Sequence, residues 1–240
     1  MKGIILAGGL GTRLYPLTYA TNKHLLPIYN KPMVFYPIKT LTDAKITEIM
    51  IVTGGPHAGD FLRVLKNGQD LGITHLEYAY QESEGGIADA LRLCESFADG
   101  QPIAVILGDN TTDADISPAS KAFKKGALVF LKEVPDPQRF GVPEFDAKDS
   151  TKIIHILEKP KNPPNNFAVT GLYFYDSLVF DFIRSMKPSA RGELEITDVN
   201  NCYIKKGQLS WSMLHGYWRD AGTFATMFEA NKYWAEKAMR

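Results

Sequence analysis

The sequence predicts an α/β fold: a single-domain, Rossmann-like, mostly parallel sheet flanked by helices. Three short apolar segments, at 3–7, 49–52 and 103–107, have the length of strands, and helical patterns separate them. The third segment is apolar throughout, which is typical of a parallel strand buried on both faces. Repeated strand–loop–helix units favour a parallel sheet, because neighbouring parallel strands need a long crossover between them.

The first half of the chain supplies these units in order. Strands are expected at 3–7, 49–52, 74–80 and 103–107, and helices at 32–44, 58–67 and 87–97. In the second helix we expect Phe61, Leu62, Val64 and Leu65 on the inner side, and in the third Ala88, Leu91 and Cys94. Ligands of such sheets bind beyond the carboxyl ends of the strands, so residues at those ends are the first candidates for a site.

The second half has a different pattern. Strands are expected at 126–133, 152–157, 167–175 and 209–214, the third interrupted at Thr170-Gly171, with a loop at 136–142. Helices are expected at 177–186 and 191–206, and a closing helix places Met227, Ala230 and Trp234 inward. We interpret this half as an acceptor-binding layer added to the same sheet, within one domain of residues 1–240.

Composition and charge exclude several classes of protein. The 240 residues are 45% hydrophobic, which supports a sizeable core, and 27 basic residues balance 27 acidic ones. This balance gives no general attraction to nucleic acid or to a membrane surface. There is no signal-peptide pattern and no stretch as long as a membrane-spanning helix. Cys94 and Cys202 show no motif spacing, so we expect reduced thiols in a cytoplasmic protein.

A glycine loop follows the first strand. Gly8, Gly9 and Gly11 fall within four positions, and Thr12-Arg13 follows. The glycines allow the backbone N–H groups to approach phosphates closely, and Arg13 and Lys23 add positive charge. Without Arg13 and Lys23, the three glycines could equally indicate a tight turn that binds no ligand.

Two common nucleotide motifs are absent. Leu14 stands where a dinucleotide fingerprint requires its third glycine, and no phosphate-binding G-x-x-x-x-G-K-[ST] motif occurs. The second strand ends in Thr53-Gly54-Gly55 instead of the acidic residue that binds the ribose of NAD. Both observations argue against an NAD site.

Acidic residues at element ends suggest a metal site. Asp109 follows a buried strand, and Asp220 lies in a loop rich in Gly and Trp. Mg²⁺ takes oxygen ligands, often one or two carboxylates together with phosphate oxygens. Asp220 could instead cap the closing helix. The five histidines show no metal-ligand spacing.

Glu158 and Lys159 end another expected strand. Adjacent side chains of a strand point to opposite faces, so we do not expect Glu158 and Lys159 to be merely an ion pair with each other. Ordinary solvated surface is the alternative.

Taken together, these motifs resemble a known family. Gly8–Leu14, Lys23–Pro27 and Lys31–Met33 resemble the signature of the sugar-1-phosphate nucleotidylyltransferases. Five further blocks resemble the glucose-1-phosphate thymidylyltransferases within that family: 107–110, 139–142, 158–160, 169–173 and 191–198. The resemblance covers nearly the whole chain and implies a fold of the nucleotide-diphospho-sugar transferase type with an added sugar-binding layer.

The resemblance implies a reaction: dTTP and α-D-glucose 1-phosphate give dTDP-glucose and pyrophosphate for dTDP-sugar biosynthesis, for example of dTDP-rhamnose. It also implies an Mg²⁺-dependent in-line displacement, with Asp109 and Asp220 as metal ligands and Arg13, Lys23 and Lys159 as catalytic residues. The implied nucleotide-binding residues are Leu6, Gly8, Gly9, Gly11, Thr12, Arg13, Gln81, Gly86 and Asp109. The implied sugar-phosphate-binding residues are Asn110, Gly141, Glu158, Lys159, Val169 and Thr170. A homo-oligomer, dimer or tetramer, is implied as well.

Some features depart from the family pattern. Asn22, Glu84 and Phe140 differ from the expected residues, and Glu84 lies near the implied base pocket. Arg219 adds a positive charge beside Asp220. The long form of these enzymes continues into a helical segment that helps to form a regulatory nucleotide site, whereas this sequence ends at Arg240. We therefore expect weak or altered end-product control through that site.

Two rival functions remain at this stage. The same chemistry could act on UTP or another sugar 1-phosphate, because thymine differs from uracil by only a methyl group, worth ~1 kcal/mol or somewhat more. A catalytically silent regulatory subunit would bind sugar nucleotide without turnover. The intact set of Arg13, Lys23, Asp109, Lys159 and Asp220 argues against the silent subunit.

Overall fold

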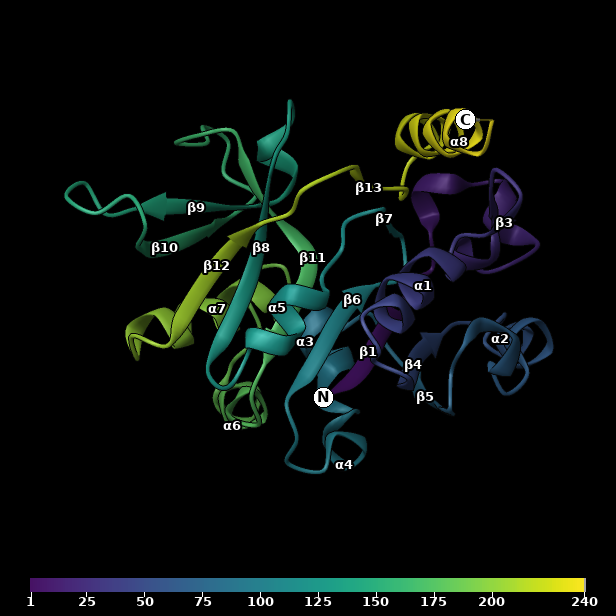
Figure 1. Ribbon diagram of the computed structural model, residues 1–240, viewed down its shortest axis with the longest axis horizontal. Helices are drawn as coiled ribbons and strands as arrows, with labels where there is room; N and C mark the ends of the chain where they lie inside the picture. The colour runs from purple at the N-terminus through teal and green to yellow at the C-terminus, as the bar shows by residue number, and fades with distance from the viewer. Residues whose placement is uncertain (240) are drawn as a thin grey trace. The chain divides into compact units, whose positions relative to one another are not determined.

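The computed structural model describes residues 1–239 and confirms the α/β class (Figure 1). The chain divides into two compact units, each built from several segments. Unit 1 contains Met1, Gly85–Val105 and Pro118–His215, and unit 2 contains Lys2–Glu84, Ile106–Ser117 and the chain from Gly216 onward.

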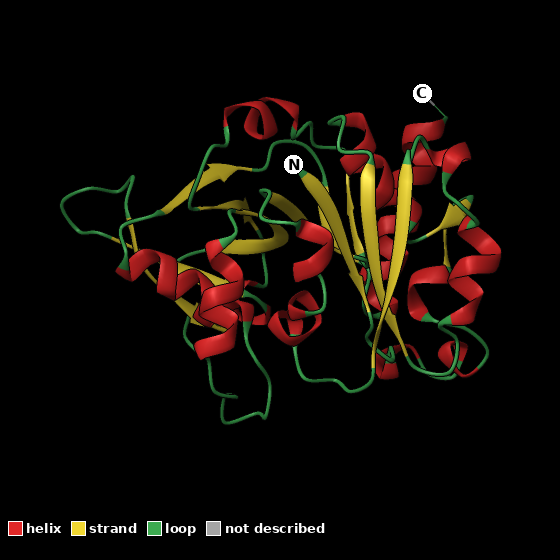
Figure 2. Ribbon diagram, turned by 90° about the horizontal axis from the view of Figure 1, so that it is seen from below, coloured by secondary structure: helices red, strands yellow, loops and turns green. Residues whose placement is uncertain are grey.

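Unit 2 contains a parallel sheet of three strands. β1 (Lys2–Ala7) and β5 (His75–Gln81) flank β4 (Glu48–Gly54), and all three run in the same direction (Figure 2). Ala7 lies opposite Thr53, and Gly54 lies opposite Gln81. Their carboxyl ends therefore bring the glycine loop and Gln81 to one edge, as expected for parallel strands.

The helices of unit 2 agree with the predicted positions, with shifted ends. α1 covers Phe35–Asp43 and α2 covers Gly59–Leu65. In α2 only Phe61 and Leu65 are buried, whereas Leu62 is 56% and Val64 38% exposed. The prediction for Leu62 and Val64 was wrong, because residues four apart share one helix face and their immediate neighbours do not.

Two small ribbons of unit 2 were not predicted. β2 (Pro27–Ile28) pairs with β3 (Lys31–Pro32), and β7 (Asn110–Thr112) pairs with β13 (Trp218–Asp220). The closing helix α8 (Phe224–Ala238) buries Ala230 and packs Met227 and Trp234 against a small apolar core, as predicted. The β7–β13 pair brings Asp220 opposite Asn110 although they are far apart in the sequence.

Unit 1 is largely antiparallel. β11 (Phe167–Tyr175) pairs antiparallel with β8 (Ala127–Glu133) and β9 (Gly141–Phe145), and β9 pairs antiparallel with β10 (Ile153–Glu158). β12 (Leu209–Met213) runs parallel to β8. The predicted interruption in 167–175 is confirmed as a register shift between Val169 and Tyr173. β9 is a strand where the sequence suggested part of a loop, because it pairs with two neighbours.

The helices of unit 1 differ from the predictions at their ends. The helix predicted at 87–97 is divided into α3 (Ile87–Arg92) and α4 (Glu95–Ala98), and α6 (Leu178–Ser185) matches its prediction. α7 (Ile196–Lys205) begins five residues later than predicted, because Gly192 is left-handed and Glu195 is extended. β6 (Ile103–Leu107) and α5 (Ser117–Ala122) each continue from one unit into the other.

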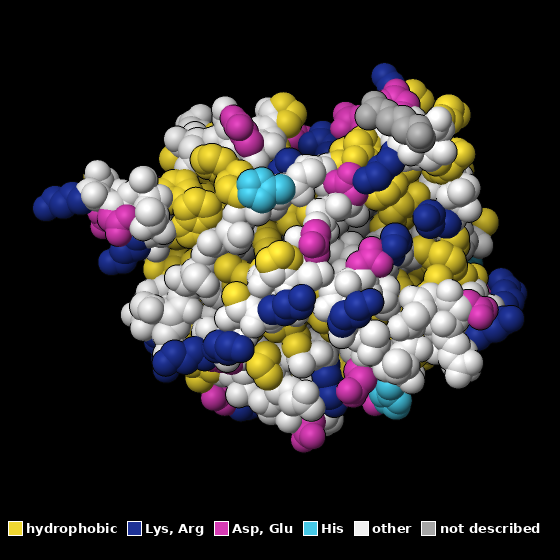
Figure 3. Space-filling model, in the orientation of Figure 1, with side chains coloured by type: hydrophobic (Ala, Val, Ile, Leu, Met, Phe, Trp, Pro, Cys, Tyr) yellow, Lys and Arg dark blue, Asp and Glu magenta, His cyan; other side chains and the backbone are white. Residues whose placement is uncertain are grey.

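The surface and the thiols agree with the composition. On the face shown in Figure 3, basic and acidic side chains lie interspersed, as the equal numbers of the two kinds suggest. Cys94 and Cys202 are both free, and Cys94 is buried. Among residues 1–239, no helix is both long and apolar enough to cross a membrane.

Candidate active site

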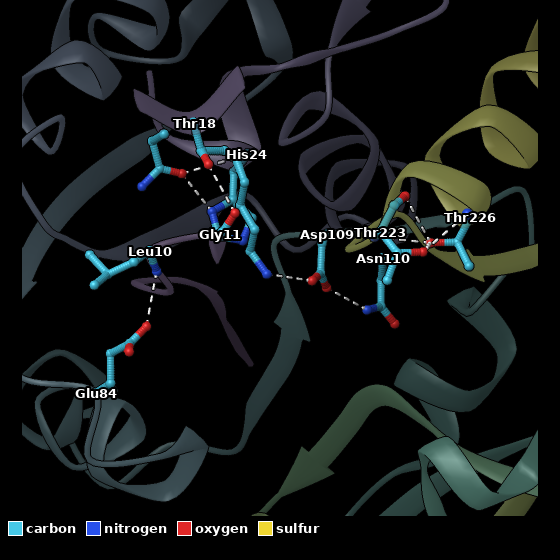
Figure 4. A network of polar contacts seen from close by, with 11 residues as sticks. Leu10, Gly11, Thr18, His24, Glu84, Asp109, Asn110, Thr223 and Thr226 are labelled. Atoms are coloured by element: carbon cyan, nitrogen blue, oxygen red, sulfur yellow. Dashed lines mark hydrogen bonds and ion pairs between the residues drawn. The ribbon is translucent and has the colours of Figure 1, made fainter. Parts of the chain in front are cut away.

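The glycine loop of unit 2 is folded around the Lys23 side chain. Gly11 has φ +72°, a left-handed conformation that favours glycine. A methyl group on Gly11 would lie 2.8 Å from Lys23 Cβ, and one on Gly9 would lie 3.7 Å from Lys23 Nζ. Thr18 Oγ1 donates a hydrogen bond of 2.9 Å to the Gly11 carbonyl (Figure 4). The predicted phosphate loop and its second cation are therefore neighbours.

Lys23 is paired with Asp109. Lys23 Nζ lies 2.7 Å from Asp109 Oδ2, and the two side chains are 12% and 11% exposed. Burial opposes ionisation of Asp109, but the Lys23 ammonium and the hydrogen bonds from Lys23 and Asn110 outweigh it and hold its pKa well below the usual range. Asp109 is therefore a carboxylate at neutral pH, as a metal ligand must be.

His24 lies in the same turn as Lys23 and was not predicted as part of the site. Its ring is buried, and Nδ1 lies 2.8 Å from Asn22 Oδ1. Burial, together with the adjacent Lys23 charge, lowers the His24 pKa to about 3, so the ring is neutral at pH 7. The Asn22 side chain also accepts a hydrogen bond from the His24 N–H at the start of the turn that carries Lys23. The sequence signal was the Asn-Lys-His order, which has the cap residue one position before the lysine.

Gly222 marks the point where the charged side chains of unit 2 converge. A methyl group on Gly222 would lie 3.2 Å from Arg13 Nη2, 3.2 Å from Asp109 Oδ2 and 3.6 Å from Asp220 Oδ2. The capping alternative for Asp220 does not hold, because Thr223 caps α8 through a reciprocal pair of hydrogen bonds with Thr226 (Figure 4). Two carboxylates beside the Arg13 guanidinium fit Mg²⁺ that also binds phosphate oxygens. Within residues 1–239 no cluster of three metal-binding side chains occurs, so the protein itself offers this site few ligands.

Asn110 lies next to Asp109 and holds it in place. Its Nδ2 donates a hydrogen bond of 3.1 Å to Asp109 Oδ1, and its Oδ1 accepts a hydrogen bond of 2.8 Å from Trp218 Nε1. Both ends of the Asn110 side chain are engaged, and the residue is 2% exposed. Its predicted contact with the sugar stays a prediction, whereas its contact with Asp109 is present in the structure.

Leu6, Gly8 and Gln81 occupy the edge of the unit 2 sheet. Leu6 is buried in β1, and a methyl group on Gly8 would lie 2.6 Å from Gln81 Oε1. The Gln81 amide therefore lies directly over the Gly8 backbone. Gly86, predicted for the same pocket, belongs to unit 1, where a methyl group on it would lie 2.6 Å from the Leu194 carbonyl oxygen. This packing gives Gly86 a structural reason to be glycine.

Unit 1 brings together several predicted sugar-binding residues. Gly141 lies opposite Val169 on β11 and opposite Glu158 on β10. A methyl group on Gly141 would lie 3.3 Å from Thr197 Oγ1, and that hydroxyl donates to Glu158 Oε2. The Thr170 hydroxyl is fully buried and has no hydrogen-bond partner among the described residues. Buried polar groups without a partner are uncommon in folded proteins.

The structure corrects the expectation for Glu158 and Lys159. Lys159 Nζ lies 3.3 Å from Glu158 Oε1, so the two do form an ion pair. β10 ends at Glu158, and Lys159 has a φ of 44°, so the alternation of a strand no longer applies to it. The Lys159 N–H donates a hydrogen bond of 3.0 Å to the Phe140 carbonyl, and this bond helps to hold the left-handed residue in place.

Arg191 joins the same cluster and was not given a role from the sequence. Its guanidinium lies 3.5 Å from Glu158 Oε1 and 2.7 Å from Glu195 Oε1. Arg191 and Thr197 both lie in the 191–198 block that carried the resemblance, and that block was their only sequence signal. Glu158 is therefore surrounded by two cations and a hydroxyl.

Comparison with known proteins gives the family. The model of the nucleotidyl transferase family matches residues 2–237. A glucose-1-phosphate thymidylyltransferase of Neisseria meningitidis serogroup A / serotype 4A is 43% identical over 239 residues, which cover 97% of this chain and 82% of that protein. This chain belongs to the nucleotidyl transferase family.

Solved structures confirm the fold of this nucleotidyl transferase. A Bacillus anthracis structure described as a glucose-1-phosphate thymidylyltransferase in complex with a sucrose shares 50% identity and a TM-score of 0.91, covering 97% of this chain and 94% of that one. A UDP-glucose pyrophosphorylase complexed with UDP-glucose gives a TM-score of 0.86 at 24% identity, covering 98% of each chain, and that likeness concerns the fold alone. The chain is therefore an enzyme of the predicted class.

Proposed function

We propose that this nucleotidyl transferase joins dTTP and α-D-glucose 1-phosphate into dTDP-glucose and releases pyrophosphate. The observation that carries the proposal is the convergence of Arg13, Asp109 and Asp220 at Gly222. Lys23 forms an ion pair with Asp109 at the same place. Two cations beside two carboxylates suit a reaction between polyanions. The names of its relatives supply the choice of thymidylyl group and glucose.

The chemistry proposed is a single in-line displacement. A phosphate oxygen of glucose 1-phosphate forms a bond to the α-phosphorus of dTTP, and the bond from that phosphorus to the bridging oxygen breaks. The electron pair leaves with pyrophosphate. The nucleophile is already an anion, so no general base is needed, and the protein contributes mainly positioning and charge stabilisation.

The residues of unit 2 are proposed to bind the nucleotide. The backbone N–H groups of Gly8, Gly9, Gly11 and Thr12 bind phosphate oxygens, and Arg13 and Lys23 stabilise the charge that develops on the leaving pyrophosphate. Leu6 and Gly8 form the floor of the base pocket, and the Gln81 amide over Gly8 hydrogen-bonds the edge of the pyrimidine. Gly86 is retained in the nucleotide-binding set as predicted.

Asp109 and Asp220 would hold Mg²⁺ beside Gly222. When bound, the ion would supply positive charge to the phosphate oxygens. Lys23 and Asn110 keep Asp109 ionised and oriented for this task.

The residues of unit 1 are proposed to bind glucose 1-phosphate. Lys159 supplies the cation for the phosphate group, and Glu158 accepts hydrogen bonds from sugar hydroxyls. The buried Thr170 hydroxyl and the backbone at Gly141 and Val169 provide further polar contacts, with Asn110 as predicted. Arg191 and Thr197 orient Glu158.

The test is pyrophosphate release with a panel of nucleotides and sugar phosphates. The native chain should be most active with dTTP and glucose 1-phosphate, and Asp109→Asn should lose at least about a hundredfold in kcat/KM, because one metal ligand loses its charge. Asp70→Asn, at an exposed aspartate of unit 2, is the matched control and should retain activity. Full activity of Asp109→Asn with an unchanged fold would refute the assignment, and a preference for UTP would refute the choice of nucleotide.

Three further statements are proposed with the same function. The reaction takes place in the cytoplasm, as for other steps that consume nucleoside triphosphates. The chain forms a homo-oligomer, dimer or tetramer, and binds neither nucleic acid nor membrane. Its product enters dTDP-sugar biosynthesis, for example of dTDP-rhamnose. Sedimentation of the purified chain tests the oligomer.

A further inference from the structure

The glycine loop of unit 2 is held by an acidic side chain. The Leu10 N–H donates a hydrogen bond of 3.1 Å to Glu84 Oε1 (Figure 4). Glu84 follows β5 by three residues, so it starts from the same sheet edge as the loop. Both residues are exposed, and Leu10 is 39% exposed. A carboxylate therefore occupies one backbone donor of the loop that is proposed to bind phosphate.

That hydrogen bond and a phosphate contact exclude each other. A backbone N–H has one hydrogen, and a carboxylate and a phosphate oxygen are both anionic acceptors for it. The carboxylate would also repel the negative charges of an incoming triphosphate. The same arrangement occurs at Lys23, whose ammonium is held by Asp109. Glu84 thus holds a backbone donor that lies between the glycines proposed to bind phosphate, and Asp109 holds the Lys23 ammonium proposed for the leaving pyrophosphate.

We propose that Glu84 is a competing anion that takes the place of a phosphate group on the glycine loop in the ligand-free protein. It leaves the Leu10 N–H when a polyphosphate binds and returns when pyrophosphate departs. Glu84 therefore lowers the affinity for the phosphate groups without contacting the base or the sugar. The inference rests on the proposed function, in which this loop binds the triphosphate.

A purely structural role makes the opposite prediction. If Glu84 only fastens the loop, its removal loosens the loop and weakens phosphate binding. If Glu84 is a competitor, its removal strengthens phosphate binding. The sign of the change in affinity separates the two roles.

The experiment is isothermal titration calorimetry of the native chain and of Glu84→Gln and Glu84→Ala without metal. The probes are inorganic tripolyphosphate, pyrophosphate, dTTP and thymidine. We expect tripolyphosphate, pyrophosphate and dTTP to bind about three- to tenfold tighter to both variants, a gain typical of one exposed charge. Thymidine, which has no phosphate, should bind equally to all three proteins. The gain should shrink at high salt, because both residues are exposed to solvent.

The control is Glu82→Gln, which removes an exposed charge two residues away. Unchanged or weaker polyphosphate binding by the Glu84 variants would overturn the inference. An equal gain in Glu82→Gln would overturn it too, because the effect would then come from net charge alone. Tripolyphosphate carries no base, so it still decides the question if the chain prefers another nucleotide and the proposed function fails on that point. Absence of polyphosphate binding in every variant would overturn both.

Discussion

The residues assigned to the nucleotide and those assigned to the sugar phosphate lie in different structural surroundings. In unit 2 the site residues follow parallel strands, glycines allow the chains to approach closely, and Lys23 and Asp109 are a nearly buried pair. In unit 1 the site residues lie on antiparallel strands, and Glu158 has several partners with partly exposed side chains. The same residue type can therefore have different roles in the two units.

Lys23 and Lys159 show this difference. Each lysine forms an ion pair with a carboxylate: Lys23 Nζ lies 2.7 Å from Asp109, and Lys159 Nζ lies 3.3 Å from Glu158. The Lys23 side chain is 12% exposed, whereas that of Lys159 is 48% exposed. A buried charge that loses its partner is costly, whereas an exposed one is solvated by water. We expect Lys23 to serve both stability and reaction, and Lys159 to serve the reaction alone.

The largest effect should come from Lys23→Gln. Asp109 would remain nearly buried without its cation, so the free energy of unfolding should fall by about 3 kcal/mol. Activity should fall by at least about a hundredfold, because the leaving pyrophosphate loses a positive charge. Urea denaturation and pyrophosphate release measure the two effects. Unchanged stability would show that the Lys23–Asp109 pair does not hold unit 2 together.

Lys159→Gln is the matched change in unit 1. The KM for glucose 1-phosphate should rise about ten- to a hundredfold, because one charge-assisted hydrogen bond to the phosphate is lost. The free energy of unfolding should change by less than about 0.5 kcal/mol, since the lysine is half exposed. Steady-state kinetics with each substrate varied in turn checks this. A change in the KM for dTTP instead would reassign Lys159 to the nucleotide.

Gly222→Ala tests the close approach of Arg13 and Asp109 to Gly222 in unit 2. The added methyl group would lie 3.2 Å from Arg13 Nη2 and from Asp109 Oδ2, closer than an ordinary contact. The side chains must shift by a few tenths of an ångström, and we expect about a tenfold loss of kcat/KM and weaker binding of Mn²⁺ as a metal probe. Gly59→Ala, where a methyl group has nothing within 4 Å, is the control and should leave both unchanged. Equal Mn²⁺ binding in both variants would place the metal elsewhere.

The smallest effect should come from Asp113→Asn, which lies outside the proposed site. Asp113 accepts from the Tyr217 N–H at 2.7 Å and contacts Tyr233 and Lys237 on α8. Burial raises its pKa, but the hydrogen bonds from Lys237, Tyr233 and Tyr217 outweigh it, so the pKa of the folded state lies below the usual value.

Asp113 therefore stabilises the fold above its pKa in the unfolded chain, and this contribution is lost as the pH falls through the lower pKa of the folded state. We expect Asp113→Asn to cost about 1 kcal/mol at pH 7 and progressively less below about pH 4. Urea denaturation at several pH values measures it. A difference that grows toward acid pH would contradict the assignment.

The sequence alone predicted most of the longer strands and most helices, because apolar periodicity and glycine positions are local properties, but it did not predict the short ribbons β2–β3 and β7–β13. It also indicated a phosphate-binding glycine loop and the residue types of a site, from motifs that depend on short spacing, and these assignments stay predictions. It could not predict β9, since a five-residue strand that contains a proline is stabilised by pairing with its two neighbours. It predicted the wrong relation between Glu158 and Lys159, because β10 ends at Glu158 and the backbone of Lys159 is left-handed, with its N–H bonded to the Phe140 carbonyl.

Only the tertiary structure decided which residues hold the charged groups in place. Asn22 caps the turn that carries Lys23. Trp218 binds Asn110, which in turn donates a hydrogen bond to Asp109. Thr223 caps α8, so Asp220 does not. Some of these contacts are local, but the one between Trp218 and Asn110 joins residues 108 positions apart, and no local pattern encodes it. The physical reason is that the type of a charged residue is set by the chemistry, whereas its orientation is set by hydrogen bonds that form only when distant strands pair.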